Sequence, residues 1–119
     1  MTDFNDFYWH DAEIKEINID RYYPGKKDEI RFNILFPDKK KVVYFIFEGI
    51  YYASFGLNFG IIADETIRYA SVLENDNDLS ILYSKWKGHL NQIKLNVYFF
   101  ELNSSESKIK IIAKGFRVE

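Results

Sequence analysis

The sequence predicts a mainly β domain of the α+β type: an antiparallel sheet of about six strands, arranged as a sandwich or a half-barrel, with one amphipathic helix packed on it. Three observations lead to this class. Residues 30–36, 93–99 and 108–112 alternate apolar and polar side chains, a period that places one face of a strand on a core and the other in water. A single run near residue 80 has helical spacing instead. The short connections carry no signature of a helical crossover between parallel strands.

The expected order of elements is β-β-β-β-α-β-β, with turn-forming residues between the strands. The strands are predicted at residues 12–20, 29–36, 41–48, 59–69, 93–102 and 108–118. Pro24 and Gly25 favour a type II turn after the first strand. Residues 37–40 and 103–107 have the composition of hairpin turns. The first strand does not keep strict alternation, which predicts a bulge at residues 15–16.

The third expected strand differs from the others because residues 42–47 are apolar on both faces. Such a strand is central in its sheet, or one of its faces is covered by a helix. Gly49 interrupts the pattern, and residues 50–60 are expected to be irregular or bulged before the fourth strand begins. A helix that starts at Asp64 is the competing prediction for this region, because the local sequence resembles a helix start.

The predicted helix is about twelve residues long, an ordinary length for a globular domain, and follows a polar loop whose aspartates are N-cap candidates. Its apolar side chains recur at helical spacing, at Leu79, Leu82, Tyr83, Trp86 and Leu90. Gly88 and His89 are expected to close the helix, and a protonated His89 would interact favourably with its dipole. We expect the helix to lie across the sheet.

The composition fits one domain over residues 1–119. The 16 basic and 18 acidic residues are spread along the chain and give a net charge of −2, which argues against a nucleic-acid surface. The basic run at residues 39–41 is expected to be a solvated turn rather than a phosphate contact. We expect a cytoplasmic protein, because there is no cysteine, no signal-peptide pattern and no apolar run of the ~20 residues that cross a membrane.

Two short segments contain side chains that could act as catalytic groups or metal ligands. Trp9, His10 and Asp11 place an imidazole beside a carboxylate, as in a general base or a metal ligand with its orienting group. Neighbouring residues of an extended chain point to opposite faces, so we expect no direct bond between His10 and Asp11 and favour a structural role at the first strand. Asp64 and Glu65 are also adjacent, and are expected to serve a turn or a cap rather than share a proton.

No metal and no cofactor are expected. With only His10 and His89 in the chain, a site of three imidazoles is impossible, and a mixed site with carboxylates has no supporting ligand spacing. The serines of residues 103–107 are attributed to turn chemistry, because a serine nucleophile needs a base and an oxyanion hole that the sequence does not indicate. Asp20 and Arg21 are interpreted as an ion pair that fixes the first hairpin.

Aromatic residues make up 18% of the chain, which is more ring area than one small core requires. Tyrosine has an apolar ring and a polar hydroxyl group, which suit a partly solvated surface. Part of this aromatic area is therefore expected at a partner interface. The rings expected to be exposed are Tyr22, Tyr23, Tyr51, Tyr52 and Phe55. Aromatic side chains are the usual anchors of protein interfaces, and their surplus favours a binding role.

Four segments of the chain together resemble a group of small bacterial proteins, some of which are similar to the immunity proteins of polymorphic-toxin systems. The segments lie within residues 9–12, 20–25, 58–67 and 103–116. They include the sequences Trp9-His10-Asp11-Ala12 and Asn58-Phe59-Gly60. The resemblance covers most of the chain. It implies a bacterial, cytoplasmic, single-domain protein without catalytic chemistry, and it carries over no catalytic residue.

Three functions are open at this point. The first is a non-catalytic binding protein of immunity type, whose partner is a protein such as a toxin. The second is a small-ligand-binding or hydrolytic protein with its site at His10, Asp11, Asp64 and Glu65, which requires the start of the first strand and the Asp64 turn to meet at one pocket. The third is a self-associating structural module, in which an exposed aromatic edge pairs with its own copy.

Overall fold

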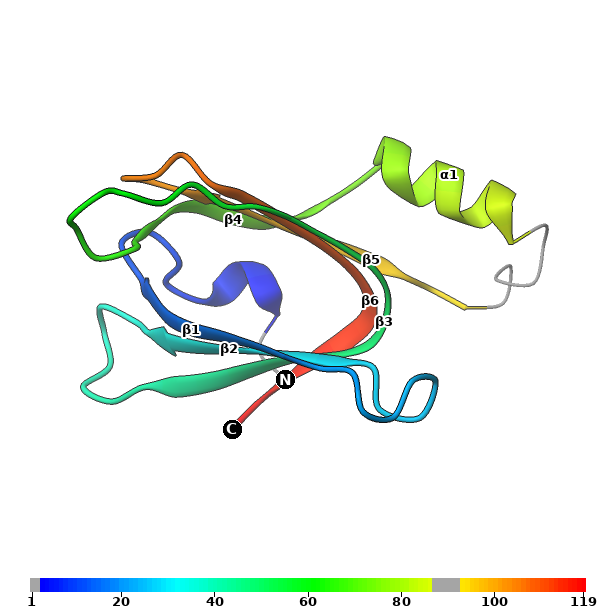
Figure 1. Cartoon of the computed structure of the whole chain (residues 1–119), viewed down its shortest axis with the longest axis horizontal. Helices are drawn as coiled ribbons and strands as arrows, with labels where there is room; N and C mark the ends of the chain where they lie inside the picture. Colours follow the sequence, from blue (N-terminus) through cyan, green and yellow to red (C-terminus); the bar gives the residue numbers. More distant parts are fainter. Residues whose placement is uncertain (1–2, 87–92) are drawn as a thin grey trace.

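In the computed structural model, which describes residues 3–86 and 93–119, six antiparallel strands form one open sheet in the order β1-β2-β3-β6-β5-β4 (Figure 1). The elements are η1 (Phe4–Asp6), β1 (Glu13–Asp20), β2 (Glu29–Leu35), β3 (Val43–Gly56), β4 (Ile67–Leu73), α1 (Asn77–Lys85), β5 (Asn96–Leu102) and β6 (Lys108–Val118). Among the described residues the one α-helix lies between β4 and β5. The predicted fold class and the predicted order of elements are therefore confirmed.

The sheet is strongly curled because its two longest strands bend. β3 and β6 are paired with each other along most of their length, and Figure 1 shows both strands turning back over the lower half of the molecule. Gly49 of β3 has φ 62°, a conformation that glycine adopts without a steric penalty. The register with β6 shifts between Ile50 and Tyr52, as at a β-bulge. The curled shape corresponds to the half-barrel form of the prediction.

An aromatic core fills the concave face of the sheet. Its fully buried rings are Phe32, Phe45, Phe47 and Phe100, which come from three strands, and Phe36, which directly follows β2. The N-terminal segment before β1, residues 3–12, also enters this core, and we call it the lead-in. Its helical turn η1 lies inside the curl (Figure 1), and Phe4 and Trp9 are both buried. Trp9 Nε1 donates a hydrogen bond of 2.6 Å to the Phe4 carbonyl oxygen, and the Phe4 ring centroid lies 4.9 Å from that of Tyr98. The lead-in thus plugs the space that the curl encloses.

The two edge strands are joined at one end of the sheet. Glu13, at the start of β1, forms an isolated β-bridge with Thr66, just before β4. Ile67 N–H donates to the Ala12 carbonyl and Asp11 N–H donates to the Ile67 carbonyl, both at 2.8 Å. These bonds satisfy backbone groups that an open edge would leave to solvent. They also fix where the segment between β3 and β4 lies.

The helix packs on the opposite face of the sheet from the aromatic core. Along β6, Ile111 and Ala113 belong to the core, whereas Ile112 between them belongs to a second cluster with Leu82 of α1. This alternation is the period-two arrangement of a strand that is covered on both faces. The predicted contact between helix and sheet is therefore present.

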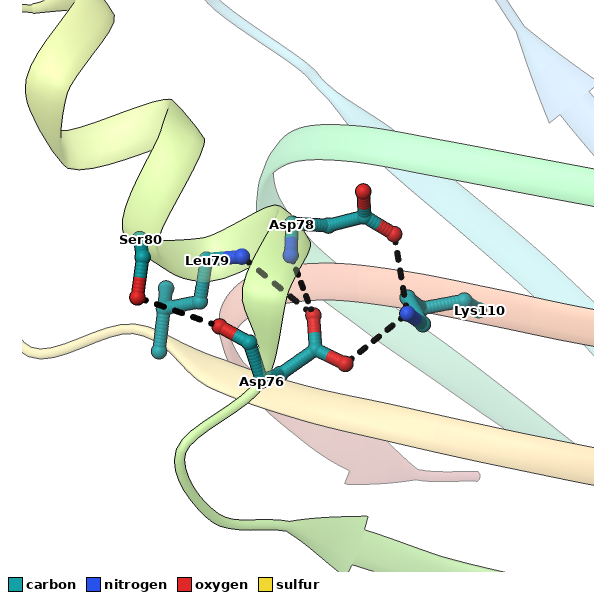
Figure 2. Close-up of polar contacts among 5 residues, drawn as sticks. All are labelled: Asp76, Asp78, Leu79, Ser80 and Lys110. Atoms are coloured by element: carbon teal, nitrogen blue, oxygen red, sulfur yellow. Dashed lines mark hydrogen bonds and ion pairs between the residues drawn. The ribbon is translucent and has the colours of Figure 1, made fainter.

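The start of α1 is fixed by charged side chains (Figure 2). Asp76 caps the helix, because its Oδ2 accepts hydrogen bonds from the backbone N–H groups of Asp78 and Leu79 at 3.0 and 3.2 Å. Lys110 Nζ on β6 donates to Asp76 Oδ1 and to Asp78 Oδ2, both at 2.8 Å. One ammonium group therefore ties the helix N-terminus to the sheet.

Several predicted boundaries are wrong. β3 does not end at Glu48 but continues to Gly56, because β6 pairs with it beyond the end of β2. The fourth strand spans Ile67–Leu73 instead of 59–69, and no helix starts at Asp64. α1 has nine residues rather than about twelve, and β5 begins at Asn96 rather than 93. Gly88, His89 and Leu90 lie outside the described residues.

The bulge predicted at residues 15–16 is confirmed by a register shift between β1 and β2, which falls between Ile14 and Glu16. The hairpin turns at 37–40 and 103–107 are also present, and β6 has the predicted bounds. Lys39, Lys40 and Lys41 are all exposed, as expected for a solvated turn.

We predict that Phe4→Ala destabilises the protein by about 3–5 kcal/mol, because it leaves a cavity among the rings that the lead-in contacts. Phe59→Ala is the matched control: Phe59 is 85% exposed, so its truncation should change the free energy of unfolding by no more than about 0.5 kcal/mol. Urea unfolding monitored by tryptophan fluorescence measures both. Equal effects of the two variants would contradict a structural role for the lead-in.

The Lys110 contacts predict a loss of stability at high pH. Burial alone would lower the pKa of Lys110, but its hydrogen bonds to Asp76 and Asp78 outweigh this and raise the pKa above the ordinary 10.5. The folded state therefore binds this proton more tightly than the unfolded chain does, and the contribution is present below pH ~10.5 and lost as the pH rises further. In urea titrations above that pH, the wild type should lose stability more steeply than Lys110→Met. Parallel pH profiles of the two proteins would contradict this.

Candidate binding surface

A groove of about 460 Å³ lies between the base of the β1–β2 hairpin and the second half of β3. It is lined by Ile19, Asp20, Arg21, Asp28, Glu29, Ile30, Ile50, Tyr51, Tyr52, Ala53 and Phe55, and we call it the tyrosine groove. The groove exists because β2 begins at Glu29, which pairs with Glu48. Within the described residues, β3 beyond Glu48 pairs with β6 on one side and with no strand on the other.

Three of the five rings expected to be exposed contribute to this groove. Tyr52 is exposed, whereas Tyr51 and Phe55 are half-buried. Phe55 packs against the aromatic core, so it forms the inner wall. Tyr51 also lines an adjacent hollow of about 530 Å³, where its ring centroid lies 6.1 Å from that of Trp86 at the end of α1. Aromatic surface therefore continues from the groove toward the helix.

The other two rings, Tyr22 and Tyr23, project from the hairpin beside the groove with exposed fractions of 86% and 61%. The hairpin that carries them is ordered by local hydrogen bonds. Tyr22 N–H donates to Asp20 Oδ1 at 2.9 Å, and the N–H groups of Lys26 and Lys27 both donate to the Tyr23 carbonyl. Both tyrosines are thus held at the surface by bonds of their backbone.

The ion pair expected between Asp20 and Arg21 does not form in this hairpin. The Asp20 carboxylate instead accepts the Tyr22 N–H and lies 3.8 Å from Lys27 Nζ. The reason is the local geometry of the turn, since an aspartate readily accepts a hydrogen bond from the backbone two residues on. Arg21 is exposed and lines the tyrosine groove.

The carboxylates beside the groove are largely paired within the protein. Arg117 Nη1 lies 3.0 Å from Glu29 and 2.9 Å from Glu48. The pKa of Arg117 is raised above its ordinary value, first by its hydrogen bond to Glu29 and then by its hydrogen bond to Glu119. Asp20 and Glu29 are thus paired, whereas Arg21 and Asp28 also line the groove and form no ion pair among the described residues, so this surface offers a ligand charged as well as aromatic contacts.

Trp9, His10 and Asp11 do not form a joint site. Trp9 is buried in the core, where a partner does not reach it. His10 and Asp11 are exposed, and the prediction that they do not touch is wrong, because His10 Nδ1 lies 3.2 Å from Asp11 Oδ2. Asp11 has φ 68°, so the chain is not extended there and the opposite-face rule does not apply. Both side chains remain open to solvent.

The side chains of Asp64 and Glu65 also contact different parts of the protein. The Asp64 side chain is exposed and lies 3.8 Å from Lys15 Nζ, whereas Glu65 Oε2 accepts a hydrogen bond of 2.8 Å from Ser105 Oγ. The backbones of this segment and of β1 meet, as Ile14 N–H donates to the Glu65 carbonyl. The side chains of His10, Asp11, Asp64 and Glu65 nevertheless have different neighbours. Within residues 3–86 and 93–119, no three His, Asp or Glu side chains are grouped to hold a metal ion.

A cluster of buried hydroxyl groups holds the segment between β3 and β4. Ser105 Oγ and Ser107 Oγ lie 2.6 Å apart, and Asn58 N–H donates to Ser107 Oγ at 2.8 Å. Asn58 Nδ2 donates to the Ser105 carbonyl, also at 2.8 Å. Glu65 completes the cluster through Ser105, although its other oxygen, Oε1, is buried without a hydrogen-bond partner among the described residues. The serines of the β5–β6 turn therefore anchor a second loop.

The sequence reasoning missed three exposed apolar side chains that lie in this loop. Phe59 is 85% exposed, Ile61 is 54% exposed and Ile62 is fully exposed. We call these three residues the apolar tip. Residues 59–62 were predicted to begin a strand with one covered face, whereas they lie outside any strand. The available signal was the glycine between the apolar residues: Gly60 has φ 94°, which ends a strand pattern.

Comparison with known proteins adds no assignment, because neither a protein-family model nor a curated protein sequence matches the chain. In the described part of the chain, no helix is long and apolar enough to cross a membrane.

The hydroxyl cluster makes a testable contribution to stability. Ser107→Ala leaves the Asn58 N–H without its acceptor in a partly buried position, which should cost about 1–3 kcal/mol. Ser104→Ala, in the same turn but exposed, is the control and should be neutral within about 0.5 kcal/mol. Urea unfolding measures both, and limited proteolysis should cut residues 57–66 faster in Ser107→Ala alone. Unchanged stability and cleavage would contradict the anchoring role.

Proposed function

We propose that this protein is a non-catalytic binding protein that engages a protein partner through the tyrosine groove and the two hairpin tyrosines. The observation that carries the proposal is the exposure of Tyr22 and Tyr23 on an ordered hairpin next to the tyrosine groove. Tyrosine anchors an interface well, because it supplies a large contact area at a low cost in side-chain entropy. Ordering the hairpin before binding lowers that cost further.

A protein is the class of partner that suits this surface best. The groove is lined by three acidic side chains, Asp20, Asp28 and Glu29, and by one basic side chain, Arg21, a balance that disfavours a phosphate backbone as its ligand. The groove lies along the side of β3 that pairs with no described strand beyond Glu48, and its lining combines aromatic and aliphatic side chains with charged ones. Protein interfaces likewise combine apolar and aromatic contacts with polar ones.

The enzymatic alternative has weaker support. A hydrolytic site would need a nucleophile or an activated water within reach of a base. His10 and Asp11 are open to solvent, while the hydroxyl that Glu65 contacts, Ser105 Oγ, belongs to a buried side chain. The separation of these groups favours the non-catalytic proposal.

The resemblance to immunity-type proteins suggests which partner to test first. We propose that the partner is a toxin domain and that the encounter takes place in the bacterial cytoplasm, as the resemblance implies. In that case, co-expression of this protein with the product of an adjacent toxin-like gene should restore growth. Failure of every adjacent gene product to bind would argue against the immunity assignment.

The hairpin tyrosines provide the sharpest test of the proposed surface. With a purified partner, Tyr22→Ser/Tyr23→Ser should weaken binding by at least about 30-fold, the effect of losing an interface hot spot of about 2 kcal/mol. Tyr8→Ser is the matched control, since Tyr8 is also an exposed tyrosine but lies away from the groove. Isothermal titration calorimetry measures the three dissociation constants. A loss of affinity in the control as large as that in the double variant would refute the surface.

A further inference from the structure

The second half of β3 leaves one edge of the sheet open inside the tyrosine groove. β2 pairs with β3 only as far as Glu48, whereas β6 pairs with it as far as Gly56. Ile50 N–H still reaches the Asp28 carbonyl at 3.3 Å, so the open edge begins after Ile50. Beyond that point, among the described residues, β3 has a strand on one side only, and its other side borders the groove. An open strand edge is a template for pairing with another chain.

The register of the sheet shows which backbone groups this edge offers. Just before β6, the Ser107 carbonyl accepts a hydrogen bond of 2.9 Å from the backbone of β5. The odd positions that follow therefore bond β5, and the even positions 108, 110 and 112 bond β3. Lys110 lies opposite Ser54, so Ser54 bonds β6. Its neighbours Ala53 and Phe55 direct their N–H and C=O groups to the other side, where no described segment bonds them.

The aromatic core is less well covered along this edge than along the first half of β3. Phe45 and Phe47, in the part of β3 that has a strand on both sides, are fully buried. Ala53 and Phe55 pack against the same core but stay half-buried. Residues 50–56 also contain none of the charged residues or prolines that commonly protect a sheet edge. A further strand beside this edge would therefore bury apolar surface as well as pair backbone groups.

These features select an extended polypeptide segment as the occupant. Backbone N–H and C=O groups that recur at every second residue match the edge of another strand, and neither a nucleic acid nor a lipid presents this pattern. The base of the β1–β2 hairpin lies across the groove, so a second copy of this chain would have to pass its own hairpin to reach the same edge. The groove lining has three acids and one base, which favours a segment of positive net charge.

We propose that the protein partner adds an extended segment to the sheet as a further strand, bonded to the backbone of Ala53 and Phe55. This inference rests on the proposed function, because it uses the tyrosine groove and names how the partner is held there. In such pairing, main-chain hydrogen bonds supply affinity and alternate side chains supply specificity. Phe55 and Tyr52 lie on opposite faces of β3, since their partners in β6 belong to the two different clusters. One face of the added segment therefore covers the core beside Phe55, and the other lies beside Tyr52.

Peptide selection followed by amide exchange tests the pairing. Linear peptides of about ten random residues, long enough for one strand, are displayed on phage and selected on the immobilised protein. The best binder is synthesised, and nuclear magnetic resonance measures amide exchange of the protein with and without it. Binding should slow exchange at Ala53 and Phe55 by at least about tenfold and leave Ser54 unchanged, because Ser54 already bonds β6. Unchanged exchange at both residues overturns the pairing, as does a selection that yields no binder.

Methylation of the peptide's backbone nitrogens separates main-chain bonding from side-chain contact. Methyl groups on every second amide should weaken binding by at least about 30-fold in one register and little in the other, because a strand directs its amides alternately to its two sides. Equal effects in the two registers would contradict the added strand.

A variant of β3 tests the same bonds from the side of the protein. Ala53→Pro should lose the peptide and stay folded, because proline is tolerated on an edge strand where its missing N–H faces no neighbouring strand. Ala53→Ser, which keeps the N–H, is the matched control and should bind like the wild type. Circular dichroism confirms the fold of both, and undiminished binding by folded Ala53→Pro argues against the pairing.

The same peptide separates this inference from the proposed function. A peptide that loses affinity for Tyr22→Ser/Tyr23→Ser but leaves the exchange of Ala53 and Phe55 unchanged retains the tyrosine surface and refutes the strand. A selection without binders refutes the strand alone, because the surface is tested with a whole partner protein. Slower exchange at Ala53 and Phe55 in the protein alone, as its concentration rises, would assign the edge to a second copy and overturn the proposal.

Discussion

The packing of the N-terminal lead-in inside the curled sheet is the constraint on which the rest of the structure depends. A sheet that bends this far brings rings from β2, β3 and β5 toward one another but leaves a space between them. Phe4 and Trp9 fill that space, and the Trp9 N–H finds its acceptor in the Phe4 carbonyl. Directly after Trp9, the backbone of Asp11 and Ala12 bonds Ile67 at the start of β4, so the lead-in also joins the two edges of the sheet.

This junction explains how the protein can present apolar side chains to water. The segment between β3 and β4 is held at its far end by the same backbone bonds that close the sheet edge, and near the tip by Ser105 and Ser107. The hairpin at the other end is ordered by Asp20 and by the Tyr23 carbonyl. In both places polar contacts of the backbone fix a loop, and the apolar side chains are left free for contact.

The sequence predicted the strands whose side chains alternate, and missed what depends on distant partners. β6 could be placed because the run from Lys108 keeps its period, whereas the length of β3 depends on β6 pairing beyond the end of β2. The exposure of Tyr22 and Tyr23 was expected because the chain has more aromatic area than one core requires and tyrosine tolerates a partly solvated surface. Trp9 could not be assigned to the core, because its burial results from the curl of the whole sheet.

The same reasoning explains why His10 and Asp11 touch although neighbours in a strand do not. Asp11 adopts a positive φ where the chain passes from the lead-in into β1. This local turn brings the side chains of His10 and Asp11 together, and the alternation of apolar and polar residues does not predict it. The β1–β2 hairpin and the loop between β3 and β4 lie toward opposite ends of the long axis (Figure 1), so the exposed tyrosines and the apolar tip belong to separate parts of the surface.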